Sequence, residues 1–168
     1  MAKLWAPWRA EYLSRHRKPS SKKCIFCLRQ HETDDSKDRV LIRGRLTFSL
    51  LNRYPYNNGH LMVAPYRHVG RLQQLTSQEW AEMLELSNDA IARLDRVMKP
   101  AGYNMGINLG RAAGAGIPGH LHLHIVPRWV GDTNFITTVA GIKVISQSLD
   151  AAYLLLKGAG KNRHKKEV

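Results

Sequence analysis

Residues 120–128 read HLHLHIVPR, a run in which histidine alternates with leucine or isoleucine. Successive side chains of a β-strand point to opposite faces, so one face of this segment would present only imidazoles, those of His120, His122 and His124. The apolar residues between them would face a core. Because buried imidazoles without partners cost free energy, we expect the histidine face to open on a ligand, a metal or water. A plain polar outer face is the alternative, but Thr, Lys or Glu would serve that purpose better.

The strand signals predict an α+β fold, with an antiparallel sheet of about five strands, one long helix and a C-terminal helix. Residues 40–52 read as a hairpin with Gly44 in its turn. Further strands are predicted over residues 60–65, 103–110 and 120–128, and a glycine-rich loop joins the last two.

The longest helical pattern covers residues 76–98, where apolar residues recur at helical spacing. Thr76 and Glu79 have the spacing of a capping box at its start. A terminal helix is predicted over residues 146–158, with Gly158 as its C-cap.

A chain of 168 residues has the size of one domain. We expect residues 24–160 to form it, after a basic segment of residues 1–23 that holds a short helix and before a basic tail of residues 161–168. No stretch approaches the roughly 20 apolar residues that cross a bilayer. The N-terminal residues also lack the apolar run of a secretory signal, so we expect a cytoplasmic protein without a membrane partner.

The formal net charge of +13 raises the question of nucleic acid binding. Most of the excess lies at the ends: residues 1–23 carry seven Lys or Arg and one Glu, and residues 161–168 carry four and one. We interpret these ends as solvated tails and do not expect a nucleic acid partner.

Two chemical interpretations of the histidines compete. Alternating histidines can bind a catalytic metal that activates water. Alternatively, the central imidazole can act as a nucleophile toward phosphorus. The loop GRAAGAGIPG, residues 110–119, exposes successive backbone N–H groups with little side-chain bulk, which suits a phosphate chain. This loop favours the second interpretation.

The segment HLHLHIVPR resembles the His-x-His-x-His-x-x signature of the histidine triad (HIT) superfamily. The likeness extends from CIFC through SLLNRYPYNNGHLMVAPYRHV to PRWVGDTNF, and it is nearest to the fragile-histidine-triad-like branch that acts on dinucleoside polyphosphates. Within that branch, the runs LW.PWR and NLG…AGAG…HLHLHIVPRWVGDTNF are similar to diadenosine tetraphosphate phosphorylases. The resemblance implies a HIT-like fold over residues 24–160.

The resemblance also implies a reaction. His122 would attack the α-phosphorus and form a nucleotidyl-histidine intermediate, which inorganic phosphate or water then resolves. A neutral imidazole with an ordinary pKa near 6.5 is available for this at neutral pH. His120 and His124 complete the catalytic set.

By motif position, the nucleotide-binding residues would be Asn52 at the ribose, and at the phosphates Asn108, Gly114, Ala115, Gly116, Ile117 and His124. The amides of Ala115, Gly116 and Ile117 would hold phosphate oxygens. A turn-capping role is the alternative for Asn52.

The pair Cys24 and Cys27 is a metal knuckle or a redox pair. A structural disulfide does not suit a cytoplasmic chain, and zinc would need two further ligands from histidines or carboxylates. His31 is a local choice, and two unligated thiols are a further alternative. The resemblance implies that His68 and His120 complete a structural zinc site.

The family resemblance implies a homodimer and an adenine dinucleotide substrate, with Mg²⁺ accompanying the substrate left open. Two other functions stay open at this point. One is hydrolysis of nucleoside phosphoramidates or acyl-adenylates, and the other is a non-catalytic nucleotide- or RNA-binding module.

Overall fold

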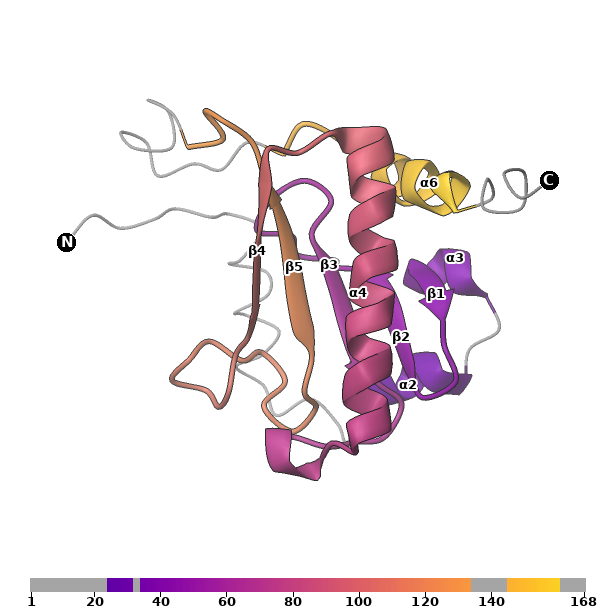
Figure 1. Cartoon of the computed structure of the whole chain (residues 1–168), viewed down its shortest axis with the longest axis vertical. Coiled ribbons are helices and arrows are strands. Elements are labelled where there is room, and N and C mark those ends of the chain that lie inside the picture. Colours follow the sequence, from indigo (N-terminus) through magenta and orange to yellow (C-terminus); the bar gives the residue numbers. More distant parts are fainter. Residues whose placement is uncertain (1–23, 32–33, 134–144, 161–168) are drawn as a thin grey trace.

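The computed structural model describes residues 24–31, 34–133 and 145–160. The helix predicted near the N-terminus and the two basic ends lie outside these residues. Within them the predicted α+β fold is confirmed. Five antiparallel strands form one sheet in the order β1-β2-β3-β5-β4, and helices lie on both of its faces (Figure 1).

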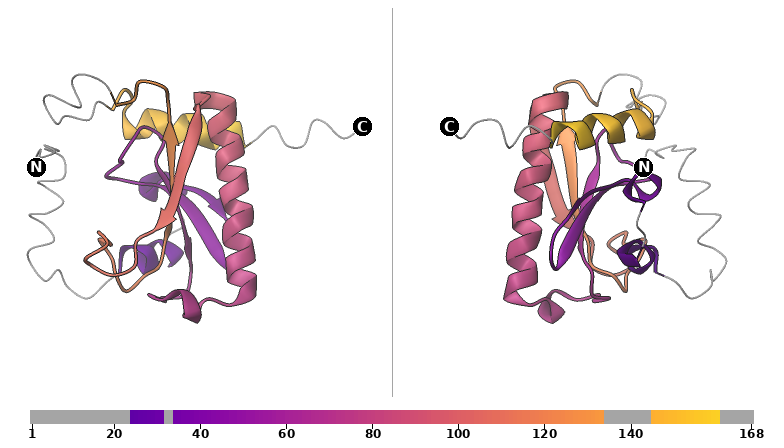
Figure 2. Two further views of the ribbon diagram at one scale, coloured as in Figure 1. Left: turned by 60° about the vertical axis from the view of Figure 1, so that its left-hand side comes forward. Right: turned by 90° about the vertical axis from the view of Figure 1, so that its right-hand side faces the viewer.

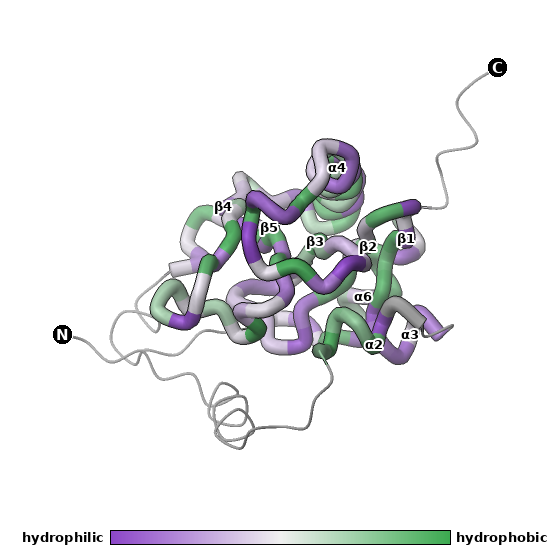
Figure 3. Tube along the Cα trace, turned by 90° about the horizontal axis from the view of Figure 1, so that it is seen from below, coloured by the Kyte–Doolittle hydropathy of each residue, from purple (hydrophilic) through white to green (hydrophobic). Residues whose placement is uncertain are grey.

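The strands are β1 (Val40–Arg43), β2 (Thr47–Leu51), β3 (Leu61–Pro65), β4 (Gly102–Ile107) and β5 (Leu123–Arg128). The helices are α2 (Ile25–His31), α3 (Asp35–Asp38), α4 (Ser77–Met98) and α6 (Leu149–Ala159), with a short 3-10 turn at Leu72–Gln74. Seen along the sheet, α4 lies on one side of the row of strands and α2 on the other (Figure 3). The side views in Figure 2 show the same arrangement.

The predicted hairpin is present, and one carboxylate of α4 secures it. Glu82 accepts hydrogen bonds from the backbone N–H groups of Arg45 (2.8 Å) and Leu46 (2.7 Å) and from the hydroxyl of Thr47 (2.9 Å). A Cβ at Gly44 would lie 2.9 Å from this carboxylate, so a larger residue in the turn would displace the Glu82 side chain. The hairpin is thereby fixed to the helix that covers the sheet.

The predicted capping box opens α4. Thr76 accepts from the N–H of Glu79 (3.1 Å), and the Glu79 carboxylate accepts from the N–H of Thr76 (2.8 Å). Glu79 is also held by Arg67, at 2.7 and 2.6 Å. The carboxylate therefore joins the helix start to the segment that follows β3.

Two apolar clusters lie on the two faces of the sheet. The larger joins α4 and α6 to the sheet and includes Leu121, Leu123 and Ile125. The smaller lies beneath α2 and includes Phe26, Phe48, Leu50 and Met62. The alternation predicted for residues 120–128 therefore holds: the apolar residues face α4, and the histidines face the α2 side.

Several details differ from the sequence predictions; among them, the strand predicted over residues 103–110 ends at Ile107. Strand β5 begins at Leu123 and not at His120, because its antiparallel pairing with β3 ends at Val63–Leu123. Before that pair, the N–H of Leu121 donates a hydrogen bond to the carbonyl oxygen of Val69 (2.7 Å). Gly158 lies inside α6, and Gly160 is the C-cap. The segment after Cys24, for which no helix was predicted, is helix α2.

Among the described residues, no helix is both long and apolar enough to cross a bilayer.

Candidate active site and metal centre

Helix α2 contributes to two adjacent sites. Ile25, Phe26 and Arg29 lie at helical spacing and line a cavity of about 260 Å³. Cys24 and Cys27 lie on the neighbouring side of the same turn, toward His120. The Phe26 ring, only 1% exposed, lies between the two sites, with its centroid 5.0 Å from that of His120 and 4.9 Å from that of His122.

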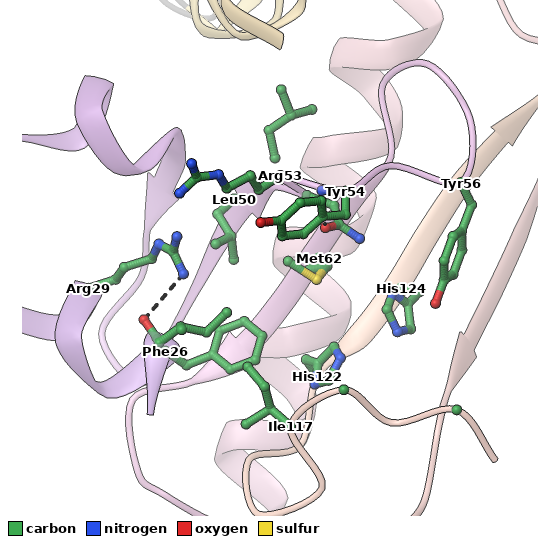
Figure 4. A pocket seen from close by; sticks show the side chains of 15 residues that line it. Phe26, Arg29, Leu50, Arg53, Tyr54, Tyr56, Met62, Ile117, His122 and His124 are labelled. Atoms are coloured by element: carbon green, nitrogen blue, oxygen red, sulfur yellow. Dashed lines mark hydrogen bonds between the residues drawn. The ribbon is translucent and has the colours of Figure 1, made fainter. Parts of the chain in front are cut away.

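The cavity has a polar end and an apolar middle. In Figure 4 the imidazoles of His122 and His124 lie at one end and Arg29 and Arg53 at the other. Between them are side chains from α2, from the β2–β3 region and from the glycine-rich loop: Phe26, Leu50, Tyr54, Met62 and Ile117.

The hydrogen bonds of His122 fix its tautomer. Its Nδ1 lies 2.9 Å from the carbonyl oxygen of His120, so Nδ1 carries the proton and donates. The Nε2 atom then keeps its lone pair, and the ring lines the cavity. Burial lowers the pKa of His122 below 6.5, and the bond to the carbonyl opposes this only in part. The imidazole is thus neutral at pH 7, with a pKa lower than the ordinary value expected from sequence.

A chain of hydrogen bonds fixes the opposite tautomer in His124. The backbone N–H of Tyr56 donates to Nδ1 of His60 (3.0 Å), so His60 Nε2 carries a proton and donates to Nδ1 of His124 (2.9 Å). His124 therefore holds its own proton on Nε2. That atom is buried and has no hydrogen-bond partner among the described residues.

Burial keeps these histidines neutral. Burial and the neighbouring His122 lower the pKa of His124 to about 4. Burial lowers the pKa of His60 well below its usual value, and His124 and His122 add to the effect. The cavity end consequently offers one lone pair, on His122, and one unpaired N–H donor, on His124. This combination suits a phosphoryl group, whose phosphorus accepts a lone pair and whose oxygens accept hydrogen bonds.

Sequence reasoning did not find His60 or Arg29. His60 is a single histidine before a strand and has no periodic partner, and only the register that places Met62 opposite His124 brings it to the triad. Arg29 lies in the segment that was not predicted to be helical, so its position at helical spacing from Ile25 had no signal.

The glycine-rich loop meets the cavity through part of its predicted set. Gly114, Gly116 and Ile117 line it. Ala115 does not: it is 7% exposed, and its N–H donates to the carbonyl of Gly110 (3.2 Å). Asn108 lies close to the loop, with its amide nitrogen 3.9 Å from the position that a Cβ on Gly114 would take. In this loop conformation the Ala115 amide is occupied within the loop.

Asn52 caps a local turn and also lines the cavity. Its carbonyl oxygen accepts from the N–H of Tyr54 (3.0 Å), which is a local turn cap. Its amide nitrogen lies 3.3 Å from Nδ1 of His60, and the residue lines the cavity.

The other triad histidine faces the cysteines. Nε2 of His120 lies 2.8 Å from the carbonyl oxygen of Pro65 and donates to it, so Nδ1 keeps a lone pair. That atom lies 3.3 Å from Sγ of Cys24 and 3.5 Å from Sγ of Cys27, and Nδ1 of His68 lies 3.2 Å from Sγ of Cys27. Burial lowers the pKa of His120 to about 4 and so keeps this lone pair available.

The ligand atoms of Cys24, Cys27, His68 and His120 all lie within 4.8 Å of one another, so this cluster can hold a metal ion. Zinc–sulfur bonds near 2.3 Å and zinc–nitrogen bonds near 2.0 Å would put the corners of a tetrahedron about 3.3–3.8 Å apart. The three sulfur–nitrogen separations given above are close to that range. The donor set therefore fits zinc. His31 ends α2, and its side chain lies outside the described part of the chain.

Comparisons with known proteins agree with this geometry. A model described as the HIT domain matches residues 33–130. An AP-4-A phosphorylase from Mycobacterium tuberculosis is 43% identical over 154 residues, covering 89% of this chain and 79% of that protein. An asymmetrical bis(5'-nucleosyl)-tetraphosphatase from Schizosaccharomyces pombe is 33% identical over 94 residues, 56% of this chain and 51% of its own length. Among solved structures, a zinc-bound histidine triad family protein from Mycobacterium smegmatis matches with a TM-score of 0.64 and 27% identity, covering 82% of this chain and 92% of its own.

Proposed function

The chain belongs to the HIT domain family, and on that premise we propose that it is a nucleotidyl-transferring enzyme that cleaves dinucleoside polyphosphates such as diadenosine tetraphosphate. The observation that carries the proposal is the pairing of tautomers at the cavity end. A lone pair on His122 Nε2 lies beside an unpaired N–H donor on His124.

The first step transfers the nucleotidyl group to the enzyme. Nε2 of His122 attacks the α-phosphorus, a P–N bond forms, and the bond from phosphorus to the bridging oxygen breaks. The remaining nucleotide leaves as a phosphate anion, which needs little protonation. His124 Nε2–H donates to a non-bridging oxygen as negative charge builds there. The positive charge that develops on His122 is stabilised by its Nδ1–H bond to the His120 carbonyl.

In the second step an acceptor oxygen attacks the same phosphorus, and the P–N bond breaks to restore neutral His122. With inorganic phosphate as the acceptor, the product is a nucleoside diphosphate. With water it is a nucleoside monophosphate and a proton. The 43% identity to the phosphorylase favours phosphate, while the tetraphosphatase similarity keeps hydrolysis as the second candidate. Mg²⁺ on the polyphosphate would lower its charge without a protein ligand.

In substrate binding we assign the ribose to Asn52 and the phosphates to the loop at Gly114, Gly116 and Ile117. Ala115 and Asn108 would support the loop from behind. The apolar middle of the cavity would hold the base.

A zinc ion held by Cys24, Cys27, His68 and His120 would serve as a structural clamp that joins α2 to the triad. His120 then acts as a ligand through its ring and as the orienting group of His122 through its carbonyl. Two reduced thiolates suit a cytoplasmic location. We assign the catalytic HIT domain to residues 24–160, with the basic ends outside it.

A homodimer is part of the proposal. Strand β4 is an edge of the sheet, and Met105 on it is 45% exposed. Trp80 and Leu84 on α4 are 38% and 46% exposed. Exposed apolar side chains on the edge strand and on the long helix suit pairing with a second copy. Sedimentation equilibrium tests it: we expect twice the mass of the chain, and a monomer at micromolar concentration would refute the dimer.

Product analysis tests the proposed reaction. The purified protein is incubated with diadenosine tetraphosphate, with and without inorganic phosphate, and the nucleotides are separated. We expect ADP and ATP in equal amounts, and only in the presence of phosphate. AMP and ATP in its absence would establish the hydrolase alternative, and no cleavage under either condition would refute the proposal.

A further inference from the structure

Arg29 places a guanidinium group at the end of the cavity away from the histidines. Its side chain is 15% exposed and lines the cavity, and Figure 4 shows Phe26 and Leu50 between it and His122. The catalytic chemistry proposed above does not use this residue. A cationic group in a largely apolar cavity needs a reason, because its desolvation costs free energy.

Most of the hydrogen-bonding capacity of Arg29 is unused. Nε donates to the carboxylate of Asp38 (3.2 Å), and Nη1 donates to the carbonyl of Ile25 (3.2 Å). A guanidinium has five N–H groups, so three remain without a partner among the described residues. The hydrogen bond from Nε to Asp38 holds the guanidinium in place.

The surroundings of Arg29 disfavour its positive charge when the cavity holds no ligand. Burial lowers its pKa, Asp38 offsets part of this effect, and the neighbouring Arg53 and Arg39 lower the pKa further. An acceptor-rich ligand edge would relieve both the desolvation and the repulsion.

The orientation of the ligand follows from the proposed function, on which this inference rests. With the α-phosphorus at His122 and the ribose at Asn52, the apolar middle of the cavity is left for the base, and Arg29 lines the cavity beyond it. The guanidinium at that end of the cavity is a pure hydrogen-bond donor.

Donors discriminate between purines. Guanine presents two neighbouring acceptors, O6 and N7, which match a guanidinium fork. Adenine presents an amino donor beside N7, and this amino group would face the donors of Arg29. We propose that Arg29 is a specificity-determining residue that donates to the O6/N7 edge of guanine, so that the cavity binds guanine nucleotides at least as well as adenine nucleotides.

The experiment compares binding of GMP and AMP to the full-length protein by calorimetry, together with turnover of the diguanosine and diadenosine tetraphosphates. Arg29→Met removes the donors, and Arg29→Gln replaces them with an amide that matches adenine. Asp38→Asn is the control, because it removes the negative charge of the ion pair, keeps an oxygen that can accept from Nε, and keeps the guanidinium. Metal content and thermal unfolding are measured for each variant, because Arg29 lies on the metal-binding helix.

We expect the wild type to bind GMP at least as tightly as AMP. Arg29→Met should lower the preference for GMP over AMP by about tenfold, and Arg29→Gln should lower it further, since a bidentate contact of this kind discriminates by one to two orders of magnitude. Asp38→Asn should keep the wild-type preference. A ratio that does not change in either Arg29 variant, or a wild type that prefers AMP tenfold, overturns the inference. If neither tetraphosphate is cleaved while the binding ratios change as expected, the proposed function fails and the base preference stands.

Discussion

Substitution of His60 perturbs the histidine end of the cavity while His122 and His124 themselves stay unchanged. It is fully buried, accepts from the Tyr56 N–H through Nδ1, and donates to His124 through Nε2. In His60→Asn the side-chain oxygen can replace Nδ1, but nothing reaches His124. In His60→Gln the terminal amide nitrogen can replace Nε2 as the donor to His124. The two variants therefore separate the two hydrogen bonds.

The magnitude follows from one buried contact. The 2.9 Å bond between His60 and His124 is lost in His60→Asn, and Nδ1 of His124 is left buried without a partner. Such a loss costs about 1–3 kcal/mol. With Nδ1 no longer supplied with a proton donor, His124 can place its own proton there and present an acceptor to the phosphate. Because 1.36 kcal/mol corresponds to a tenfold change, we expect kcat to fall by about 5–160-fold.

The assay is steady-state cleavage of diadenosine tetraphosphate across pH, with circular dichroism and metal content as folding controls. His60→Gln should recover most of the activity that His60→Asn loses. Nitrogen-15 NMR of the histidine rings should show His124 protonated on Nε2 in the wild type and in His60→Gln. A folded, metal-loaded His60→Asn variant with wild-type kcat would refute the relay.

Three further outcomes follow from the same contacts. Arg67 and the other hydrogen bonds lower the pKa of Glu79 from 4.5 to about 2, so Glu79→Gln should destabilise the protein at pH 7 by about 3 kcal/mol. This stabilisation is complete above about pH 4.5 and is lost as the pH falls through 2, so the urea midpoints of variant and wild type should converge at low pH. A difference between the two urea midpoints that does not depend on pH would contradict this reasoning. Glu85→Gln, on the exposed face of α4, is the control. Chelation of the metal should lower the thermal midpoint by several degrees and weaken AMP binding, because α2 contributes to both sites; unchanged AMP affinity in the metal-free protein would refute this coupling. Since burial lowers the pKa of His122, the acid limb of kcat/KM should have its midpoint below pH 6.5, and a midpoint at or above 6.5 would show that the ring is not the buried nucleophile.

The sheet and its long helix could be predicted from the sequence because each has a local sequence pattern. Alternation at residues 120–128 determines which side chains share a face, and the Thr76–Glu79 pair marks the helix start. These signals need no tertiary partner. The ends of elements depend on distant pairing, so β5 begins at Leu123, where its register with β3 ends, and not at His120.

The site was predictable only where residues recur in a pattern. The four candidate metal ligands came from the cysteine spacing and the family resemblance, and the structure brings their ligand atoms within 4.8 Å of one another. His60 and Arg29 have no such pattern, since each reaches the cavity through packing of segments far apart in the chain. The hydrogen bond that occupies the Ala115 amide is equally invisible in sequence, because it depends on how the loop folds back to Gly110.

The central claim is that His122 Nε2 forms a bond to phosphorus during turnover. The most direct measurement is acid-free quenching of the enzyme during cleavage of diadenosine tetraphosphate, followed by proteolysis and mass spectrometry of the peptide that contains residues 120–128. Our account predicts an adenylyl group on His122, formed and discharged at rates compatible with kcat and absent in His122→Ala. An adduct on another residue, or full activity in His122→Ala, would contradict it.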